Sequence, residues 1–272
     1  MTTVSQRRVC RVLSVSRSSL NRQPRSPAKP VVDELLAARL KRLIEEHPTY
    51  GYRRLWALLR YREGVVVNKK AVYRILRIKG WSVHQRSSSP RPRVQAKRSV
   101  AQESNERWAI DVAHLDAGVD GRAHLVAVID CHDREVVGYE LALRGRAQEA
   151  ERALEEACLE RFGTVQPTGP RPVIRSDNGL IFQSRRFRES CRDYGLSQEF
   201  ITPYTPEQNG LIERFFRSLK EECIWLHNYR SFEELRVAVA QWLEWYNSER
   251  PHQSLGYLAP RQYNERKRPQ VA

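Results

Sequence analysis

The chain has 272 residues, of which 40% are hydrophobic, so at least one buried core can form, and its formal net charge is +15. The excess of positive charge lies in residues 1–104, which contain 24 Lys and Arg but only 6 Asp and Glu. Residues 105–272 contain 23 Lys and Arg and 26 Asp and Glu. No apolar run approaches the ~18 residues of a membrane span, and no secretory leader is visible. The five cysteines are odd in number and lack C-x-x-C spacing, which disfavours zinc sites and disulfide frameworks. We therefore expect a cytoplasmic protein whose first part meets a polyanion.

Residues 1–24 are predicted to hold a first helix-turn-helix segment. Two short helices are expected on either side of Ser14 and Val15, with Val9, Val12 and Leu13 at helical spacing. The alternative is a frayed basic tail.

Residues 25–84 are predicted to form a helix-turn-helix-like DNA-binding domain of three helices, after a proline-rich start. The first helix is expected over 32–47, with Leu35, Leu36, Leu40, Leu43 and Ile44 on one face. The second covers 52–61. The third covers 68–80, where Asn68 is a plausible N-cap and Gly80 a natural residue to follow the helix. Its start carries candidate DNA contacts, which are Lys69, Lys70 and Arg74. A solvated basic face on a small bundle is the alternative.

Residues 85–103 are polar, basic and proline-containing, and are expected to be a basic linker.

From residue 104 the pattern changes to short strands and longer helices. The predicted order βββαβαβαα indicates an α/β core over 104–249, with a mixed five-stranded sheet flanked by helices. His132, Asp133 and Arg134 form a tight turn that should pair its strands antiparallel. A C-terminal tail follows over 250–272. Strands are expected at 107–116, 123–130, 135–143, 172–176 and 197–201, and helices at 147–162, 184–194, 207–227 and 231–247.

Three carboxylates of this core are candidate metal ligands. Asp111 lies in the middle of an apolar strand, where a carboxylate is costly unless it is paired or holds a metal. Asp177 directly follows a buried strand, the position where α/β sheets place ligands. Glu213 lies near the start of a long helix. Hard oxygen ligands without a His or Cys cluster suit Mg²⁺ or Mn²⁺. Two such ions ~4 Å apart could activate a hydroxyl and stabilise a leaving oxygen, with Asp111 bridging both.

The helix of Glu213 also presents Asn209, Arg217 and Lys220 on the same face. An acid beside cations suits a metal site next to a phosphate track, although an ordinary pair of Glu213 with Arg217 would leave the same pattern.

Other acids and histidines compete for these roles. Asp116 is an odd number of positions from Asp111 and so faces the other side of a regular strand, and Asp130 and Asp133 flank the turn, where Asp is common. Structural roles are favoured for the histidines, which are His114, His124 and His132.

These motifs resemble the retroviral-integrase-like transposases of bacterial insertion sequences, specifically the OrfB type of the IS-three family. Thirty-five residues separate Asp177 from Glu213, the spacing of the D,D(35)E motif, and Pro203-Tyr204, Gly210 and Leu219-Lys220 flank the glutamate as in that family. Further resemblances lie at Tyr50–Arg54, Asn68–Arg74, Trp108–Asp111 and His252–Pro260.

The resemblance implies an RNase H-like fold and Mg²⁺-dependent cleavage and strand transfer at element ends. Water or a DNA 3′-hydroxyl would be the nucleophile, without a covalent protein–DNA intermediate. It implies terminal inverted repeats and target DNA as partners, a homo-oligomer on DNA, a nucleoid-associated location, and an upstream-frame protein as a further partner. DNA contacts are then expected from Arg53, Arg54, Asn178 and Asn209 as well as from the cations above, which are Lys69, Lys70, Arg74, Arg217 and Lys220. Asn178 stands where many relatives have His.

Two other functions remain open. A non-catalytic DNA-binding regulator, or the accessory half of a frameshifted transposase, would explain the basic first part but not three placed carboxylates. A metal-dependent nuclease of the same fold would cut DNA without joining ends.

Overall fold

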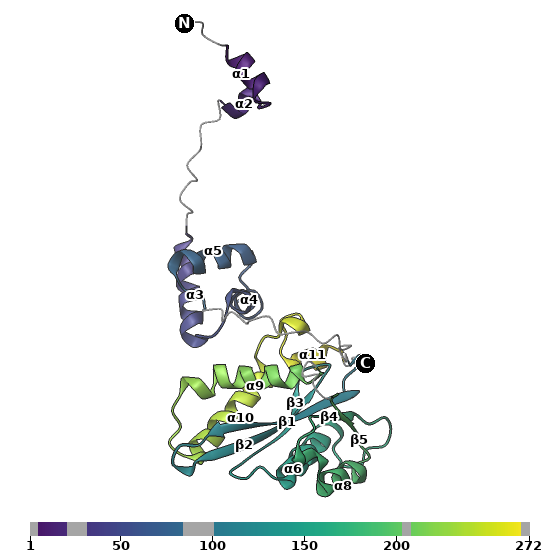
Figure 1. Cartoon of the computed structure of the whole chain (residues 1–272). Coiled ribbons are helices and arrows are strands. Elements are labelled where there is room, and N and C mark those ends of the chain that lie inside the picture. Colours follow the sequence, from purple (N-terminus) through teal and green to yellow (C-terminus); the bar gives the residue numbers. More distant parts are fainter. Residues whose placement is uncertain (1–4, 21–31, 84–100, 203–207, 268–272) are drawn as a thin grey trace, which may run out of the picture.

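The computed structural model describes residues 5–20, 32–83, 101–202 and 208–267 (Figure 1). The expected basic linker therefore lies mostly outside the described residues. Among the described helices, none is both long and apolar enough to cross a bilayer.

The first segment forms two short helices, α1 (Gln6–Val12) and α2 (Arg17–Leu20), with a turn at Ser14, whose φ is +53°. Two helices around this position were predicted. Their apolar side chains do not pack as expected, however, because Val12 and Leu13 are 77% and 61% exposed. Among the described side chains of this segment, Cys10 is the buried one, so no core of its own is described here.

Three helices follow: α3 (Glu34–Glu46), α4 (Tyr52–Ala57), which continues as one π-helical turn over Leu58–Arg62, and α5 (Lys69–Lys79). Asn68 caps α5 by accepting from the Lys70 amide, and Gly80 follows with φ +71°, as predicted. Leu35 was wrongly predicted to share the apolar face of α3: it is 82% exposed, because it lies about 100° around the helix from Leu36 on the side away from Leu40. The buried core of this module includes Leu36, Leu40, Leu43, Leu55, Leu59, Val72, Ile75 and Leu76.

The remaining chain is built on a mixed five-stranded sheet, as predicted. Its spatial order is β3-β2-β1-β4-β5. β1 pairs antiparallel with β2, β2 pairs antiparallel with β3 around the predicted turn, and β4 and β5 continue the sheet parallel to β1. The strands are β1 (Arg107–Asp116), β2 (Arg122–Asp130), β3 (Val136–Ala142), β4 (Val173–Ser176) and β5 (Ser197–Phe200).

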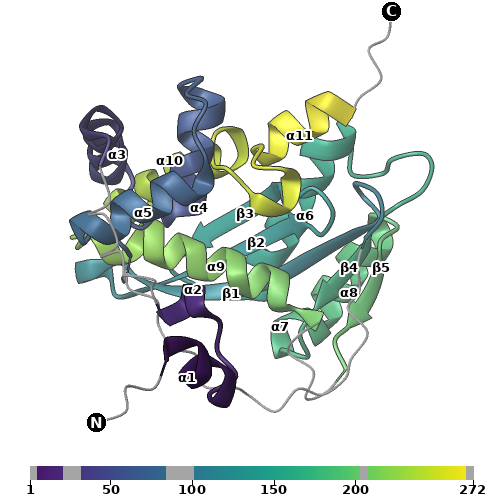
Figure 2. The same cartoon turned by 90° about the horizontal axis from the view of Figure 1, so that it is seen from above.

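Helices cover both faces of the sheet (Figure 2). On one side lie α6 (Ala147–Phe162), the unpredicted short α7 (Leu180–Gln183) and α8 (Arg185–Asp193), against Trp108 and Ile110 of β1. On the other lie α9 (Gly210–Glu222) and α10 (Phe232–Ser248), against Ala109 and Ala113. Since side chains alternate along a strand, the odd-numbered residues of β1 face α9.

The segment after α10, which was predicted as a tail, is folded onto the core in its described part. It contains a 3₁₀ turn (Gln253–Leu255) and α11 (Pro260–Lys267). Arg250 is only 3% exposed. Arg261 and Asn264 of α11 both bind the Glu135 carboxylate at the start of β3, at 3.2 and 2.8 Å. Ion pairs, which short-range sequence patterns do not reveal, hold this segment in place.

The three-helix module rests on the core through Trp245 of α10, which packs against the hydrophobic clusters of both. His47 stacks on Trp245 with ring centroids 5.8 Å apart. The Glu222 carboxylate, at the end of α9, accepts from Arg54 of α4 at 2.8 Å and from Arg250 at 2.7 Å. The module and the helix that carries Glu213 are therefore linked by a half-buried ion-pair network.

A candidate metal-binding active site

Asp111 lies in mid-β1, opposite Ala127, on the face covered by α9. Its Oδ1 accepts the Val112 amide at 2.8 Å. Burial, together with the negative charges of Asp177 and Glu213, raises the pKa of Asp111 to about 6, although the Val112 hydrogen bond and Lys220 act in the opposite direction. Asp177 and Glu213 therefore lie close enough to Asp111 for their negative charges to raise its pKa.

Asp177 comes one residue after β4, the parallel neighbour of β1. Ala109 pairs with Arg175 at the end of that ladder, and the Asp177 charge acts on the Asp111 carboxyl two residues further along β1. The Asp177 Oδ1 accepts the Gly179 amide at 2.9 Å. A Cβ on Gly179 would lie 2.8 Å from that oxygen, so a larger residue at 179 would push the Asp177 carboxylate from its present position.

Glu213 lies in the first turn of α9 and is exposed. Both Glu213 and Arg217 are described, and no ion pair joins them, so the ordinary i,i+4 explanation for this glutamate is not observed. A carboxylate in a first helical turn is favoured by the helix dipole. The side chain is thus available at the edge of the face that holds Asp111.

The donor set of these three acids is all hard oxygen, which fits Mg²⁺ or Mn²⁺. Within the described ranges, no three His, Cys, Asp or Glu side chains are already gathered as a metal-binding group. Asp111 and Asp177 each turn one oxygen to a neighbouring backbone amide, which leaves the second oxygen of each for another ligand. Like charges that raise a neighbour's pKa repel each other, and a divalent cation between them removes that cost.

The competing acids have other partners or directions. Asp116 is exposed and faces the opposite side of β1 from Asp111. Asp130 is fully buried, and its oxygens accept the amides of Asn105 and His132, both at 2.7 Å. Asp133 is likewise buried and binds Arg161 at 2.9 Å. These contacts brace the β2–β3 turn.

The histidines make local contacts. His114 and His124 face each other across β1 and β2 with their Nδ1 atoms 3.0 Å apart. His132 Nδ1 lies 3.1 Å from the Ala101 carbonyl oxygen. A structural role accounts for each.

The candidate DNA contacts of the core differ in how exposed their side chains are. Arg217 is exposed, whereas Lys220 is half-buried and acts on the Asp111 carboxyl. Asn178 is exposed and donates to the Ile201 carbonyl at 3.1 Å. Asn209 is only 3% exposed at the start of α9, and its Oδ1 has no hydrogen-bond partner within the described residues. Burial makes Asn209 the weakest DNA-contact candidate of this group.

Among the candidate DNA contacts of the three-helix module, some are exposed and others already have partners within the protein. Lys70 and Arg74 are exposed. The Lys69 ammonium lies 4.0 Å from the centre of the Trp56 ring and 5.0 Å from that of Tyr257. Arg53 donates to Gln253 at 3.3 Å. Arg54 is already engaged by Glu222, so its charge is offset where the sequence suggested a free cation.

Arg175 is a positioning residue that the sequence analysis did not single out. It is 4% exposed, donates to the Glu199 carboxylate at 3.0 Å, and donates to the Gln208 carbonyl at 3.2 Å. It therefore ties β4 and β5 to the residues just before α9. The signal was present, because an arginine in a four-residue buried strand needs a partner.

Replacing Asp111 by asparagine is expected to stabilise the metal-free protein at neutral pH. The folded-state pKa of Asp111 is raised, so its contribution to stability is present below the ordinary Asp value and is lost as the pH rises through about 6. At about 1.4 kcal/mol per pH unit, the rise of the pKa from 3.8 to about 6 means that Asp111→Asn should gain about 3 kcal/mol at neutral pH and almost nothing below pH ~4. Urea unfolding in EDTA measures this. The exposed Asp116→Asn is the control, and an equal gain there would contradict the explanation.

Comparisons with known families agree along the chain. The family described as Integrase core domain matches residues 101–206 and again residues 194–260. The family described as HTH-like domain matches residues 31–88.

Two curated relatives are similar over most of their length. An uncharacterized 31.7 kDa protein of insertion element IS407 from Burkholderia multivorans is 33% identical, over 96% of this chain and 90% of that protein. The transposase InsD of insertion element IS2 from Escherichia coli is 32% identical, over 83% of this chain and 76% of that protein. Among solved structures, a chain of the simian T-cell lymphotropic virus intasome in complex with the PP2A regulatory subunit B56 gamma matches with a TM-score of 0.50 at 20% identity, over 86% of this chain and 76% of that chain.

Proposed function

Because the chain belongs to the insertion-element transposases of the IS-three family, with an HTH-like domain before an integrase core, we propose that it cleaves and joins DNA at the ends of its own element. Asp111, Asp177 and Glu213 are the proposed metal-binding catalytic residues. The observation that carries this assignment is the Asp111 carboxyl in mid-sheet, whose pKa is raised by burial and by the charges of the other two acids.

Each acid has a distinct part in the proposed mechanism. Bound at these carboxylates, two Mg²⁺ or Mn²⁺ ions would supply activation of the attacking hydroxyl and stabilisation of the leaving oxygen. Asp111 is held by the sheet, Asp177 by its bond to the Gly179 amide, and Glu213 is an exposed side chain that can turn toward a bound cation. Lys220 offsets part of the negative charge near Asp111.

The reaction needs no covalent protein–DNA intermediate. A water or a DNA 3′-hydroxyl forms the new P–O bond, the old P–O bond breaks, and its oxygen leaves with the electron pair and takes up a proton. The number of phosphodiester bonds is conserved when a 3′-hydroxyl attacks, so joining requires no external energy source.

DNA capture is assigned mainly to the basic first part. We propose that residues 25–84 bind the terminal inverted repeats through Lys70 and Arg74, after a further helix-turn-helix segment at 1–24. Residues 85–103 act as linker, residues 104–249 form the catalytic core, and the described part of the following segment, up to residue 267, packs against it. Target DNA, a second copy of the chain and an upstream-frame protein are further proposed partners.

Incubation of the protein with a duplex that carries the element's terminal inverted repeat, plus Mg²⁺, is expected to give joined strands on a gel. EDTA should abolish joining, because the carboxylates then lack their cations. Cutting without joining would instead indicate a nuclease, and binding without any Mg²⁺-dependent product would indicate a regulator. Joining that appears only after the upstream-frame protein is added would identify an accessory half.

A further inference from the structure

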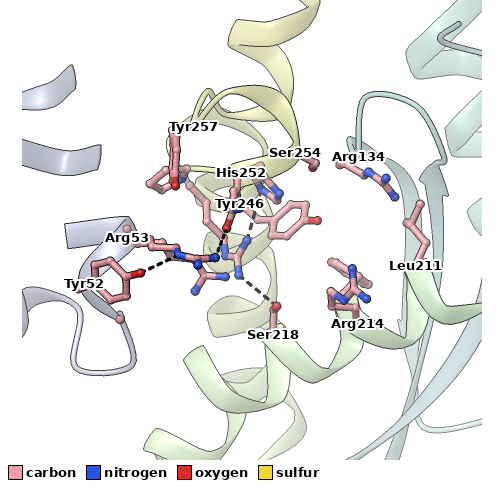
Figure 3. Close-up of a pocket in the computed structure, with 16 residues that line it drawn as sticks. Tyr52, Arg53, Arg134, Leu211, Arg214, Ser218, Tyr246, His252, Ser254 and Tyr257 are labelled. Carbon is pink, nitrogen blue, oxygen red and sulfur yellow. Dashed lines mark hydrogen bonds between the residues drawn. The ribbon is translucent and has the colours of Figure 1, made fainter. Parts of the chain in front are cut away.

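A hollow of about 790 Å³ lies between α4 of the three-helix module, α9 of the core, and the segment after α10 (Figure 3). Its lining comes from parts of the chain far apart in sequence. Figure 3 shows Arg53 on the side of the module and Arg134 and Arg214 on the side of the core. The hollow exists only because the module is docked against the core.

The hollow is strongly cationic. Among the described residues that line it there are five arginines and no carboxylate. Two of them, Arg54 and Arg250, share the nearby Glu222 carboxylate. The remaining arginines, Arg53, Arg134 and Arg214, form no ion pair with any residue of the described ranges.

Arg134 and Arg214 both line the hollow, and the charge of Arg214 acts on the Arg134 guanidinium. Arg134 sits in the β2–β3 turn with φ +67°, and its Nε is buried without a hydrogen-bond partner in the described structure. Burial lowers the pKa of Arg134, and the charge of Arg214 adds to this, although Cys131, Tyr246 and Asp130 act in the opposite direction. A half-buried guanidinium whose Nε lacks a partner is costly, and an anion bound at the two side chains would relieve that cost.

The hollow lies between two further cationic regions, one at the start of α5 and one along α9. A second hollow, which contains Lys69 and Lys70 at the start of α5, shares four lining residues with it: Tyr52, Arg53, Gln253 and Tyr257. On α9, Arg214 is three residues from Arg217, which in turn is four residues from Glu213, so these side chains are successive neighbours on the helix surface. Cations therefore run from the DNA-binding helix, through the hollow, to the candidate active site.

We propose that this hollow, with Arg53, Arg134 and Arg214, binds the phosphodiester backbone of the DNA strand that passes from the three-helix module to the catalytic carboxylates. The inference rests on the proposed function for the direction of the strand. Guanidinium groups bind phosphate oxygens in a paired, planar geometry, and three of them around one hollow suit consecutive phosphates. The ligand is thus a polyanion and not a single small anion.

The test is the salt dependence of binding of the full-length protein to a fluorescein-labelled DNA duplex. Arg134→Gln with Arg214→Gln should lower affinity at least about tenfold and reduce the slope of log K against log salt by about 2, because two phosphate contacts are lost. Arg134→Lys with Arg214→Lys retains both positive charges and should recover most of the salt dependence of DNA binding. The matched control is Arg188→Gln with Arg192→Gln, two exposed arginines of α8 on the opposite side of the sheet.

An unchanged slope in the Arg134/Arg214 double variant, with a folded spectrum like that of the wild type, would overturn the proposal. So would equal losses in the α8 control. Displacement of the duplex from the wild type by inorganic pyrophosphate at constant ionic strength would show a small-anion site instead.

Strand joining separates this proposal from the function on which it rests. If the wild type joins DNA ends and the Arg134→Gln/Arg214→Gln variant binds and joins like the control, the proposed DNA path through the hollow is wrong and the transposase assignment stands. If the wild type never joins ends but the same variant loses two phosphate contacts, the DNA path stands and the catalytic assignment fails.

Discussion

Asp177→Asn is expected to lower Mg²⁺-dependent strand joining by about a thousandfold or more while DNA binding stays at the wild-type level. The substitution removes one negative charge from the proposed cation site, and several kcal/mol of transition-state stabilisation correspond to that factor. The fold should persist, because the asparagine oxygen can still accept the Gly179 amide that now binds Asp177 at 2.9 Å. Joining is scored on terminal-repeat DNA, and binding is measured separately by fluorescence anisotropy.

Asp116→Asn is the matched control for this variant, since Asp116 is exposed on the opposite face of β1 from Asp111. It should join DNA as well as the wild type. Retention of strand joining in Asp177→Asn would refute the catalytic assignment, whereas loss of both binding and joining would point to a structural defect and remove the support for a metal ligand at this position.

Glu222→Gln is expected to lower the free energy of unfolding by about 3 kcal/mol. Glu222 is 7% exposed at its side chain and Arg250 is 4% exposed, with two contacts of 2.7 Å between them. Removal of the carboxylate charge leaves the buried Arg250 without its counter-charge, and it also weakens the 2.8 Å contact with Arg54 of the three-helix module. Urea unfolding, followed by tryptophan fluorescence, measures the loss.

The neighbouring Glu221→Gln removes the same charge from the next residue, which forms no ion pair within the described residues, and should change stability by no more than about 0.5 kcal/mol. Equal effects of the two variants would show that the network does not hold the module. Because Trp245 stacks on His47 across the same interface, its fluorescence should also change in Glu222→Gln before global unfolding.

Most of the elements could be predicted from local patterns. The strand that carries Asp111 was expected over 107–116 and forms over those residues, and the helix at 147–162 has the predicted bounds. Capping explains the accuracy of α5, because Asn68 and Gly80 carry local signals that need no tertiary context. The alternation of side chains along β1 also placed Asp116 on the face opposite Asp111.

Errors arose where side chains meet distant partners. Leu35 fits an apolar helix pattern but lies outside the narrow face that the other helices cover. The segment from residue 250 looked like a tail because its order depends on Arg250 reaching Glu222 and on Arg261 reaching Glu135. A polar, charged stretch shows no hydrophobic period, so its fixed position was not visible.

The sequence by itself determined the family, the mixed α/β core, and three acids at strand and helix positions suited to metal ligation, because periodicity, capping and motif spacing are local properties of the chain. Only the tertiary structure decided which cations are free. Arg54 is offset by a glutamate 168 residues away, Lys220 lies near Asp111, and Arg134 and Arg214 line one hollow without an ion pair to any described residue. Charge pairing depends on distance in space, and the docking of the three-helix module on the core sets those distances.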